Sequence, residues 1–505
     1  MNNNFMNGLN SIMNYGYTEN GAIKRNTTNS GLADLFAMGA AYRKRSDADV
    51  ITLFKNAFEE NESYALKCLF YISDCRGGQG ERRFFRVCMR WLAQNHPEAA
   101  RRNLKLIPEY RRWDDLYVFD GTPLEKDAYA FIKEQLALDV QCKTPSLLAK
   151  WLKSINTSSE ESRRLGNKTR EYLGMTHKQY RKTLSILRER INVLERLMSA
   201  GQWDKIEFDK IPSRAGMIYK NAFARHDIER MKANKEVRSY ADFAKDTTTK
   251  VNAKALYPYE CVAEALKCRY FDLEDPQRLM TNKYWDNIED VIKGATFNGI
   301  VVADTSGSMT GPNADAPINV AISLALYCAE RCSGPYAGHY ISFASRPQLI
   351  KIEGVDFVDK VDRIYRTNLV DSTNIEATFD LLLDVAIMNK LPQDQIPQNV
   401  LIISDMEFDC ARGGGSYWNR RSSENGTKTL MEGIEKKWSR YGYKMPQLVF
   451  WNVDARHDNI AMTMKDGVSF VSGMSPMIFK QVLSNKTAID LMYEVLDQVR
   501  YSCIK

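Results

Sequence analysis

The residues best suited to chemistry in this 505-residue chain follow a short apolar stretch at residues 300–303. Asp304, Ser306 and Ser308 alternate with other residues, so an extended backbone would point one carboxylate and two hydroxyl groups the same way. Gly307 permits the tight turn that brings such oxygen atoms together. Because a ligand set made only of oxygen favours Mg²⁺ or Mn²⁺ over Zn²⁺, the spacing predicts part of a divalent-cation site.

Two later segments supply further oxygen atoms. Thr373 stands just before a predicted helix at residues 375–388, and Asp405 follows a second apolar stretch at residues 399–404. The carboxyl ends of neighbouring parallel strands lie side by side where the strand order reverses. We therefore expect Asp304 and Asp405 to meet at one edge of a sheet, with Thr373 beside them.

Each of these residues also has a simpler interpretation. Ser306 and Ser308 could cap the helix expected to begin near residue 316, and Thr373 could cap the helix at residues 375–388. Asp405 could be a turn residue, and the nearby acids Glu407 and Asp409 could be solvated. The coincidence of three segments, each at a strand end or a helix start, favours the cation site.

The Asp-x-Ser-x-Ser motif at residues 304–308, followed by Thr373 and Asp405, resembles the metal-ion-dependent adhesion site of von Willebrand factor A domains. The resemblance implies a Mg²⁺ or Mn²⁺ ion bound by Asp304, Ser306, Ser308, Thr373 and Asp405. The ion would keep one coordination position open for an acidic group of a protein partner. A flexible basic insert at residues 411–421 could rim such a site or be a plain surface loop.

The motif content favours binding over catalysis. The predicted site has two carboxylates, and the sequence places no His or Lys beside it as a general base. No Walker loop, protein-kinase motif set, Gly-x-Ser-x-Gly or His-Glu-x-x-His sequence occurs. We therefore expect a protein that is not an enzyme, with a metal-dependent hydrolase as the weaker alternative.

Composition indicates an intracellular globular protein. Hydrophobic residues make up 44% of the chain and charged residues 26%, and no stretch reaches the about 20 apolar residues needed to span a bilayer. The polar first ten residues lack the apolar core of a signal peptide. The ten cysteines are scattered without a Cys-x-x-Cys pair and the five histidines are isolated, so we expect neither a disulfide framework nor a zinc site.

Charge and periodicity change near residue 290. Residues 291–505 carry 22 basic and 24 acidic side chains, so the remaining 48 basic and 39 acidic ones give residues 1–290 a net charge of +9. The C-terminal part alternates strands and helices, which predicts a doubly wound, Rossmann-like α/β sheet. We expect two domains, residues 1–290 and 291–505. The predicted strands are residues 300–304, 338–344, 348–352, 400–404, 447–453 and 468–471, and the predicted helices are 318–331, 375–388 and 476–501.

The N-terminal part has almost no strand pattern. Its apolar residues recur at helical spacing in short segments, separated by Gly and Pro at positions such as Pro97, Pro108, Pro145 and Gly201. These segments predict paired, HEAT-like helices stacked in an array, although no regular sequence period is visible. The apolar segment at residues 285–294 is unlike a flexible tether, so we expect the C-terminal domain to close the array into a ring.

A helical array followed by such a domain resembles the Ro (TROVE-module) RNA-binding proteins. Four stretches, at residues 74–82, 107–116, 211–215 and 252–260, resemble more closely an uncharacterised Ro-like family of viruses, phages, plants and fungi. The resemblance implies a ribonucleoprotein that binds RNA through its helical part.

The N-terminal chemistry is compatible with RNA binding, because arginines stand beside aromatic residues and this combination binds phosphates and stacks on bases. A solvated helix face with core aromatics is the alternative. Gly77, Gly78 and Gly80 could likewise offer backbone N–H groups to a phosphate or form a tight turn. The candidate RNA-binding residues are Arg76, Arg82, Arg83, Arg86, Arg111, Arg112, Arg163, Arg164, Lys168, Arg170, Lys178 and Arg181.

The sequence thus supports a cytoplasmic, Ro-like RNA-binding protein that is not catalytic and carries a Mg²⁺-type site. A second hypothesis is a protein-interaction scaffold, or a component of a viral particle, whose metal binds a carboxylate of the partner.

Overall fold

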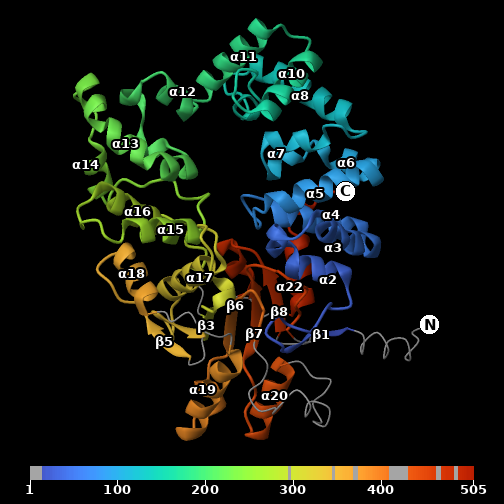
Figure 1. Ribbon diagram of the computed structural model, residues 1–505, viewed down its shortest axis with the longest axis vertical. Helices are drawn as coiled ribbons and strands as arrows, with labels where there is room; N and C mark the ends of the chain where they lie inside the picture. The colour runs from blue at the N-terminus through green and yellow to red at the C-terminus, as the bar shows by residue number, and fades with distance from the viewer. Residues whose placement is uncertain are drawn as a thin grey trace. The chain divides into compact units, whose positions relative to one another are not determined.

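The computed structural model describes residues 14–293, 297–343, 347–367, 374–408, 430–461, 468–482 and 487–505 (Figure 1). The chain forms two compact units, each built from separate segments. We call Met1–Cys68, Leu256–Asp272 and Ile288–Val499 the sheet unit, and Leu69–Ala255, Leu273–Asn287 and Arg500–Lys505 the helical unit. The predicted boundary at residue 290 lies close to one of the points where the chain passes between them.

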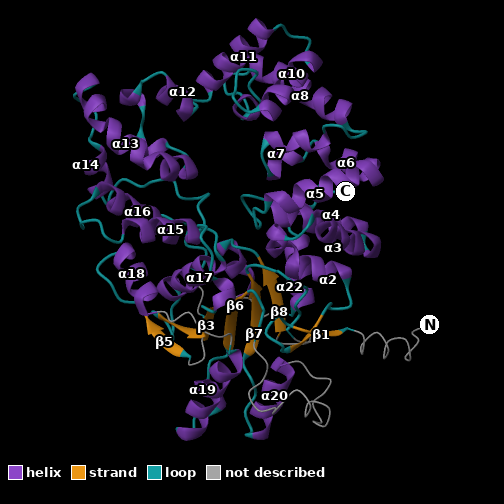
Figure 2. Ribbon diagram, viewed as in Figure 1, coloured by secondary structure: helices purple, strands orange, loops and turns teal. Residues whose placement is uncertain are grey.

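The sheet unit contains a six-stranded mixed sheet, visible as the orange arrows of Figure 2. The strand order is β5-β4-β3-β6-β7-β8, and every neighbouring pair is parallel except the antiparallel pair β4–β5. The strands are β3 (Gly299–Asp304), β4 (His339–Phe343), β5 (Gln348–Lys351), β6 (Asn399–Ser404), β7 (Gln447–Asn452) and β8 (Val468–Ser472).

Strands β3 and β6 lie at the centre of the sheet. All their residues are buried, as expected of parallel strands covered on both faces, which read as continuous apolar runs rather than alternating patterns. They pair in parallel, with Ala303 opposite Ile403. The chain leaves β3 for β4 on one side and later returns to β6 on the other, so the strand order reverses between β3 and β6.

The helices of the sheet unit agree with the predicted alternation in part. Helix α17 packs against β3, β4 and β6, and α19 has the predicted bounds. The predicted single helix at residues 476–501 is wrong, because Thr487 caps a new helix, α22, by accepting the N–H of Asp490. Helices α18 and α20 were not predicted. The helices are α2 (Gly31–Met38), α3 (Asp47–Glu60), α15 (Pro258–Cys268), α17 (Pro317–Arg331), α18 (Phe357–Thr367), α19 (Ile375–Met388), α20 (Leu430–Arg440), α21 (Phe479–Val482) and α22 (Ala488–Leu496).

N-terminal residues form part of the sheet unit. A short antiparallel hairpin joins β1 (Tyr15–Tyr17) to β2 (Ile23–Arg25), and Arg25 makes an isolated bridge to Ile460. Helix α2 packs against β8, and α15 packs against α17 and α18. Strands of three residues give no detectable alternation, which explains why the sequence did not predict this hairpin.

The helical unit has helices throughout its described residues, as predicted. Helix α8 contacts α10 and α11, and α14 contacts α13 and α16. Helix α4 (Glu62–Ser73) passes from the sheet unit into this one. The HEAT-like array and the closed ring stay predictions. The helices are α5 (Arg82–Asn95), α6 (Pro97–Leu104), α7 (Ile107–Tyr110), α8 (Glu125–Gln141), α9 (Leu148–Trp151), α10 (Glu160–Tyr172), α11 (His177–Arg190), α12 (Leu194–Ser199), α13 (Ser213–Ala233), α14 (Tyr240–Lys245) and α16 (Pro276–Asp286).

The glycine-rich segment between α4 and α5 is a tight turn. The backbone N–H groups of Gln79 and Gly80 donate to the carbonyl oxygens of Tyr71 and Asp74, at 3.1 and 3.0 Å. A Cβ atom on Gly78 would lie 2.0 Å from the Tyr71 carbonyl oxygen, so this position has no room for a side chain. Because the protein's own carbonyls accept these N–H groups, the turn interpretation holds at Gln79 and Gly80.

The last six residues belong to the helical unit. The Arg500 guanidinium pairs with the fully buried Asp74 carboxylate, with Nη2 2.7 Å from Oδ1. The ring of Tyr501 is also fully buried and stacks on Tyr110, with ring centroids 5.9 Å apart. In the described part of the chain, every helix is too short or too polar to cross a membrane.

Candidate functional site

Asp304 lies at the carboxyl end of β3 and is fully buried. Its Oδ1 accepts the backbone N–H of Ser306 at 2.9 Å, and its Oδ2 accepts the hydroxyl of Ser404 at 2.6 Å. Ser404 is the last residue of β6. The predicted meeting of the two strand ends therefore occurs, and it places the Asp304 carboxylate next to β6.

Three more predicted ligands lie beside Asp304. The hydroxyl oxygens of Ser306 and Ser308 are 3.0 Å apart, and the Ser308 hydroxyl opposes the rise in the pKa of Asp405. Asp405 is buried, and its Oδ1 accepts the N–H of Glu407 at 3.2 Å. The structure thus gathers Asp304, Ser306, Ser308 and Asp405 in one place. Thr373, the fifth predicted ligand, and the insert at residues 411–421 lie outside the described residues.

The negative charges of Asp304 and Asp405 are only partly compensated by cationic side chains. Burial and the neighbouring Asp405 charge raise the pKa of Asp304 to about 7. Burial also raises the pKa of Asp405, against the opposing effect of Arg456, whose Nη2 lies 2.8 Å from Asp405 Oδ2. Among the described residues no cationic side chain pairs with Asp304. Two buried carboxylates with one compensating arginine, plus two hydroxyls, form a donor set that fits a hard divalent cation.

The capping alternatives are wrong where the structure describes them. Helix α17 has Ala316 at its N-cap with no side-chain hydrogen bond, so neither Ser306 nor Ser308 caps it. The N-cap of α19 is Asn374, whose side chain accepts the N–H of Ala377, rather than Thr373. Glu407, interpreted as a solvated acid, is instead fully buried.

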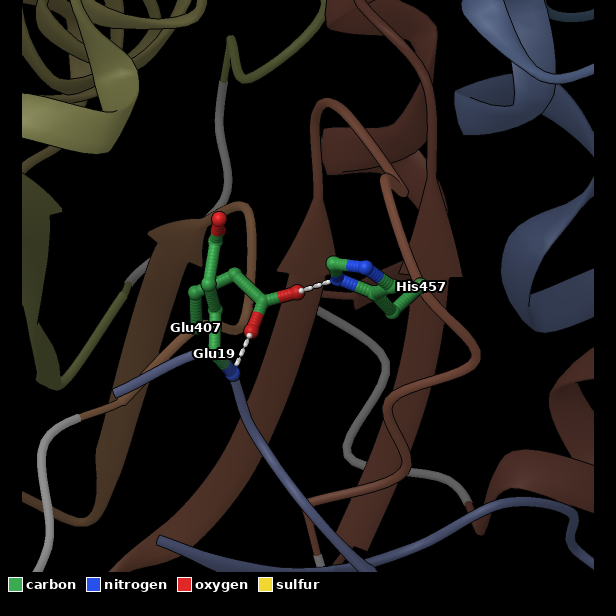
Figure 3. A group of neighbouring side chains, drawn as sticks. All are labelled: Glu19, Glu407 and His457. Carbon is green, nitrogen blue, oxygen red and sulfur yellow. Dashed lines mark hydrogen bonds and ion pairs between the residues drawn. The ribbon is translucent and has the colours of Figure 1, made fainter. Parts of the chain in front are cut away.

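Glu407 belongs to a cluster with Glu19 and His457 that sequence reasoning missed (Figure 3). Its Oε1 lies 2.8 Å from His457 Nδ1 and 2.6 Å from Asn459 Nδ2, and its Oε2 accepts the Glu19 N–H at 2.7 Å. The Glu19 carboxylate pairs with Arg456 at 3.2 Å. These contacts hold the segment after β1, and we call Glu19, Glu407 and His457 the latch. Arg456 links the latch to Asp405.

Four predicted RNA-binding residues, at positions 163–170, have partners within the protein. Arg164 lies 2.6 Å from Asp120 and 2.7 Å from Glu161, and Lys168 lies 2.7 Å from both Asp120 and Glu125. Arg170 pairs with Glu171, and Arg163 donates to the carbonyls of Thr157 and Ser158.

A second basic group surrounds Asp114 and Asp115, just after α7. It contains Arg82, Arg86, Arg111, Arg112 and Lys153, each within 4 Å of at least one of the two carboxylates. We call these seven residues the arginine cluster. Burial opposes the charge of Asp115, but Arg111, Arg86 and Arg82 outweigh it and hold the pKa of Asp115 below its usual range.

Four further predicted RNA-binding residues lie elsewhere in the helical unit. Arg76 donates to the carbonyl of Glu109, and Arg83 lies half-buried in the first turn of α5. Lys178 and Arg181 lie exposed on α11.

Comparison with known proteins places these features in a family. A family model described as "Domain of unknown function (DUF2828)" matches residues 18–114 and 137–295, and a second, "Domain of unknown function (DUF7788)", matches residues 298–500. The chain is 30% identical over 516 residues to the uncharacterized protein L728 of Acanthamoeba polyphaga mimivirus, covering 94% of this chain and 85% of that protein. The crystal structure of the Deinococcus radiodurans Ro (RSR) protein aligns with a TM-score of 0.41 and 12% identity, covering 93% of this chain and 99% of that one.

Proposed function

The chain belongs to the DUF2828 family, and we propose that it is a non-catalytic RNA-binding protein whose sheet unit holds a Mg²⁺ or Mn²⁺ ion. The observation that carries the metal site is the convergence of Asp304, Ser306, Ser308 and Asp405 at the ends of β3 and β6. Thr373 would complete the ligand set, as in a von Willebrand A domain. The ion would supply a Lewis-acidic position for an acidic group of a partner.

The residues around the ion have separate tasks. Ser404 and the Ser306 N–H hold both Asp304 oxygens in place, so the carboxylate is oriented before the ion arrives. Arg456 and the Glu407 N–H do the same for Asp405. With only these two acids and no positioned base among the described residues, the site suits binding better than hydrolysis.

We propose that RNA binds to the N-terminal part of the chain, residues 1–290, because this part carries an excess of positive charge. Residues 1–290 carry a net charge of +9, whereas residues 291–505 carry −2. Such an excess favours a polyanion. We propose a Ro-like arrangement of HEAT-like helices closed into a ring, and a cytoplasmic location or one within a viral particle. A scaffold that binds a partner carboxylate is the second candidate, because the metal site alone would suffice for it.

Titration calorimetry with Mg²⁺ tests the metal site. We expect the wild-type chain to bind the ion with measurable heat and Asp304→Ala to show none, because the substitution removes the central carboxylate. Asp497→Ala, which removes an exposed carboxylate elsewhere in the sheet unit, should bind as the wild type does. If the wild type shows no heat of binding, or if Asp304→Ala binds Mg²⁺ equally well, the proposed metal site is wrong.

RNA that co-purifies with the wild-type protein tests the RNA function. We expect a raised absorbance ratio at low salt and recovery of nucleic acid that ribonuclease digests. Its retention should fall steeply with salt, because each neutralised phosphate releases counterions. If the purified protein contains no nucleic acid and does not bind added single-stranded RNA, the scaffold function is the better explanation.

A further inference from the structure

The two basic groups of the helical unit differ in charge balance. Around Arg164 and Lys168 stand three carboxylates, those of Asp120, Glu125 and Glu161, so two cations face three acids. In the arginine cluster five cations contact the two carboxylates of Asp114 and Asp115. The arginine cluster therefore keeps an excess of positive charge, whereas the other group is neutralised within the protein.

Counting Glu81 with the cluster does not remove this excess. The Glu81 side chain accepts the N–H groups of Arg83 and Phe84 as the N-cap of α5. Five cations would still face three acids. The charge of an unbalanced cluster is most readily compensated by an anion from outside.

The buried part of the cluster is the ion pair between Arg111 and Asp115. Arg111 is almost fully buried, and its Nε lies 3.0 Å from Asp115 Oδ2 while its Nη1 donates to the carbonyls of Ser73 and Glu81. Its Nη2 is buried and has no hydrogen-bond partner. Asp115 in turn accepts Arg86 Nε at 2.5 Å. The buried Arg111–Asp115 pair therefore positions the guanidinium of Arg86 through Asp115.

The rim of the cluster is open to solvent. The exposed fractions of the Arg82, Arg86, Arg112 and Lys153 side chains are 37%, 41%, 33% and 30%. Arg112 makes a two-point contact with Asp114 through Nε and Nη2, with Nε 2.7 Å from Oδ1. Its guanidinium also lies 3.7 Å from the centre of the Trp151 ring. A guanidinium held flat between a carboxylate and an indole loses little entropy when it binds a ligand.

We propose that the arginine cluster binds a phosphate group of single-stranded RNA, with Arg112 and Lys153 as the contacting cations. This inference rests on the proposed RNA function and assigns it a site. Planar guanidinium groups match the oxygens of a phosphate, and the half-buried Trp151 beside Arg112 adds an aromatic surface next to the charge. Residues 163–170 are not part of this site, because Asp120, Glu125 and Glu161 already neutralise Arg164 and Lys168.

Two double variants of the full chain test the site. Arg112→Gln with Lys153→Gln removes two charges from the rim of the cluster. Arg164→Gln with Lys168→Gln removes two charges from the neutralised group and is the matched control. The probe is a fluorescein-labelled oligouridylate, with anisotropy measured across a salt series. Melting curves of both variants establish that each is folded.

We expect the cluster variant to lose at least about tenfold in affinity, because it removes two charged hydrogen-bond donors that contact the phosphate. The slope of log K against log salt should fall by about 0.7 for each lost phosphate contact. The control should bind within about twofold of the wild type, since its charges are already paired. Suppose that the wild type binds RNA but the cluster variant binds equally well, or that the control loses as much affinity as the cluster variant. In either case the proposed site is wrong, whereas RNA binding by the protein is still supported. If the wild type binds no RNA, the proposed function fails as well.

Discussion

Asp304→Asn is expected to abolish Mg²⁺ binding and yet to raise the melting temperature of the metal-free protein. Burial raises the pKa of Asp304 to about 7, so folding takes up a proton between the ordinary pKa of an aspartate and this value. The free energy of unfolding therefore falls as pH rises through that window, and the full loss of stability is present above it. Asparagine has the same shape and no charge, so it removes that cost, which is roughly 4 kcal/mol at a pH of about 8.

Thermal melting in the presence of a chelator measures this effect. At a pH of about 8 the variant should melt above the wild type, and at a pH of about 5 the difference should shrink because wild-type Asp304 is then protonated. Added Mg²⁺ should raise the melting temperature of the wild type and leave the variant unchanged.

Asp74→Asn is the matched control, because Asp74 is equally buried but pairs with Arg500. It should lower the melting temperature, since it leaves a guanidinium without its partner. A metal-free Asp304→Asn protein that melts below the wild type would mean that the carboxylate serves the fold rather than an ion.

Tyr501→Ala is expected to destabilise the helical unit by about 3–5 kcal/mol, the usual cost of deleting a buried aromatic ring. The Tyr501 ring is fully buried, stacks on Tyr110 and meets the edge of Tyr71 at a centroid distance of 6.1 Å. Its hydroxyl lies 3.2 Å from Asp74 Oδ2. Loss of the ring leaves a cavity within the helical unit.

Hydrogen exchange read by mass spectrometry locates the effect. Faster exchange should appear in peptides around Tyr71 and Tyr110 and not in β3 or β6, and Mg²⁺ binding should persist. Tyr501→Phe retains the ring and loses only the hydroxyl, so it should cost about 1 kcal/mol. Unchanged exchange around Tyr110 in Tyr501→Ala would show that the last six residues do not stabilise this unit.

The sequence alone determined the candidate metal centre to a large extent. The apolar runs before Asp304 and Asp405 predicted buried parallel strands, and parallel strands on either side of an order reversal bring their carboxyl ends together. Strand positions and the α19 bounds followed from the same local signals. These features depend on periodicity within a few residues, which a single sequence displays.

The tertiary structure decided which charges stay available. Arg164 and Lys168 pair with Asp120, which lies 44 and 48 positions earlier in the chain, and no local pattern reports such a partner. Glu407 looked like a solvated acid, but the backbone at Glu19, 388 positions away, covers it. The same holds for Asp74 and Arg500, which are separated by 426 positions. Burial and ion pairing depend on contacts between distant segments, so only the folded chain distinguishes a neutralised basic segment from an unbalanced one.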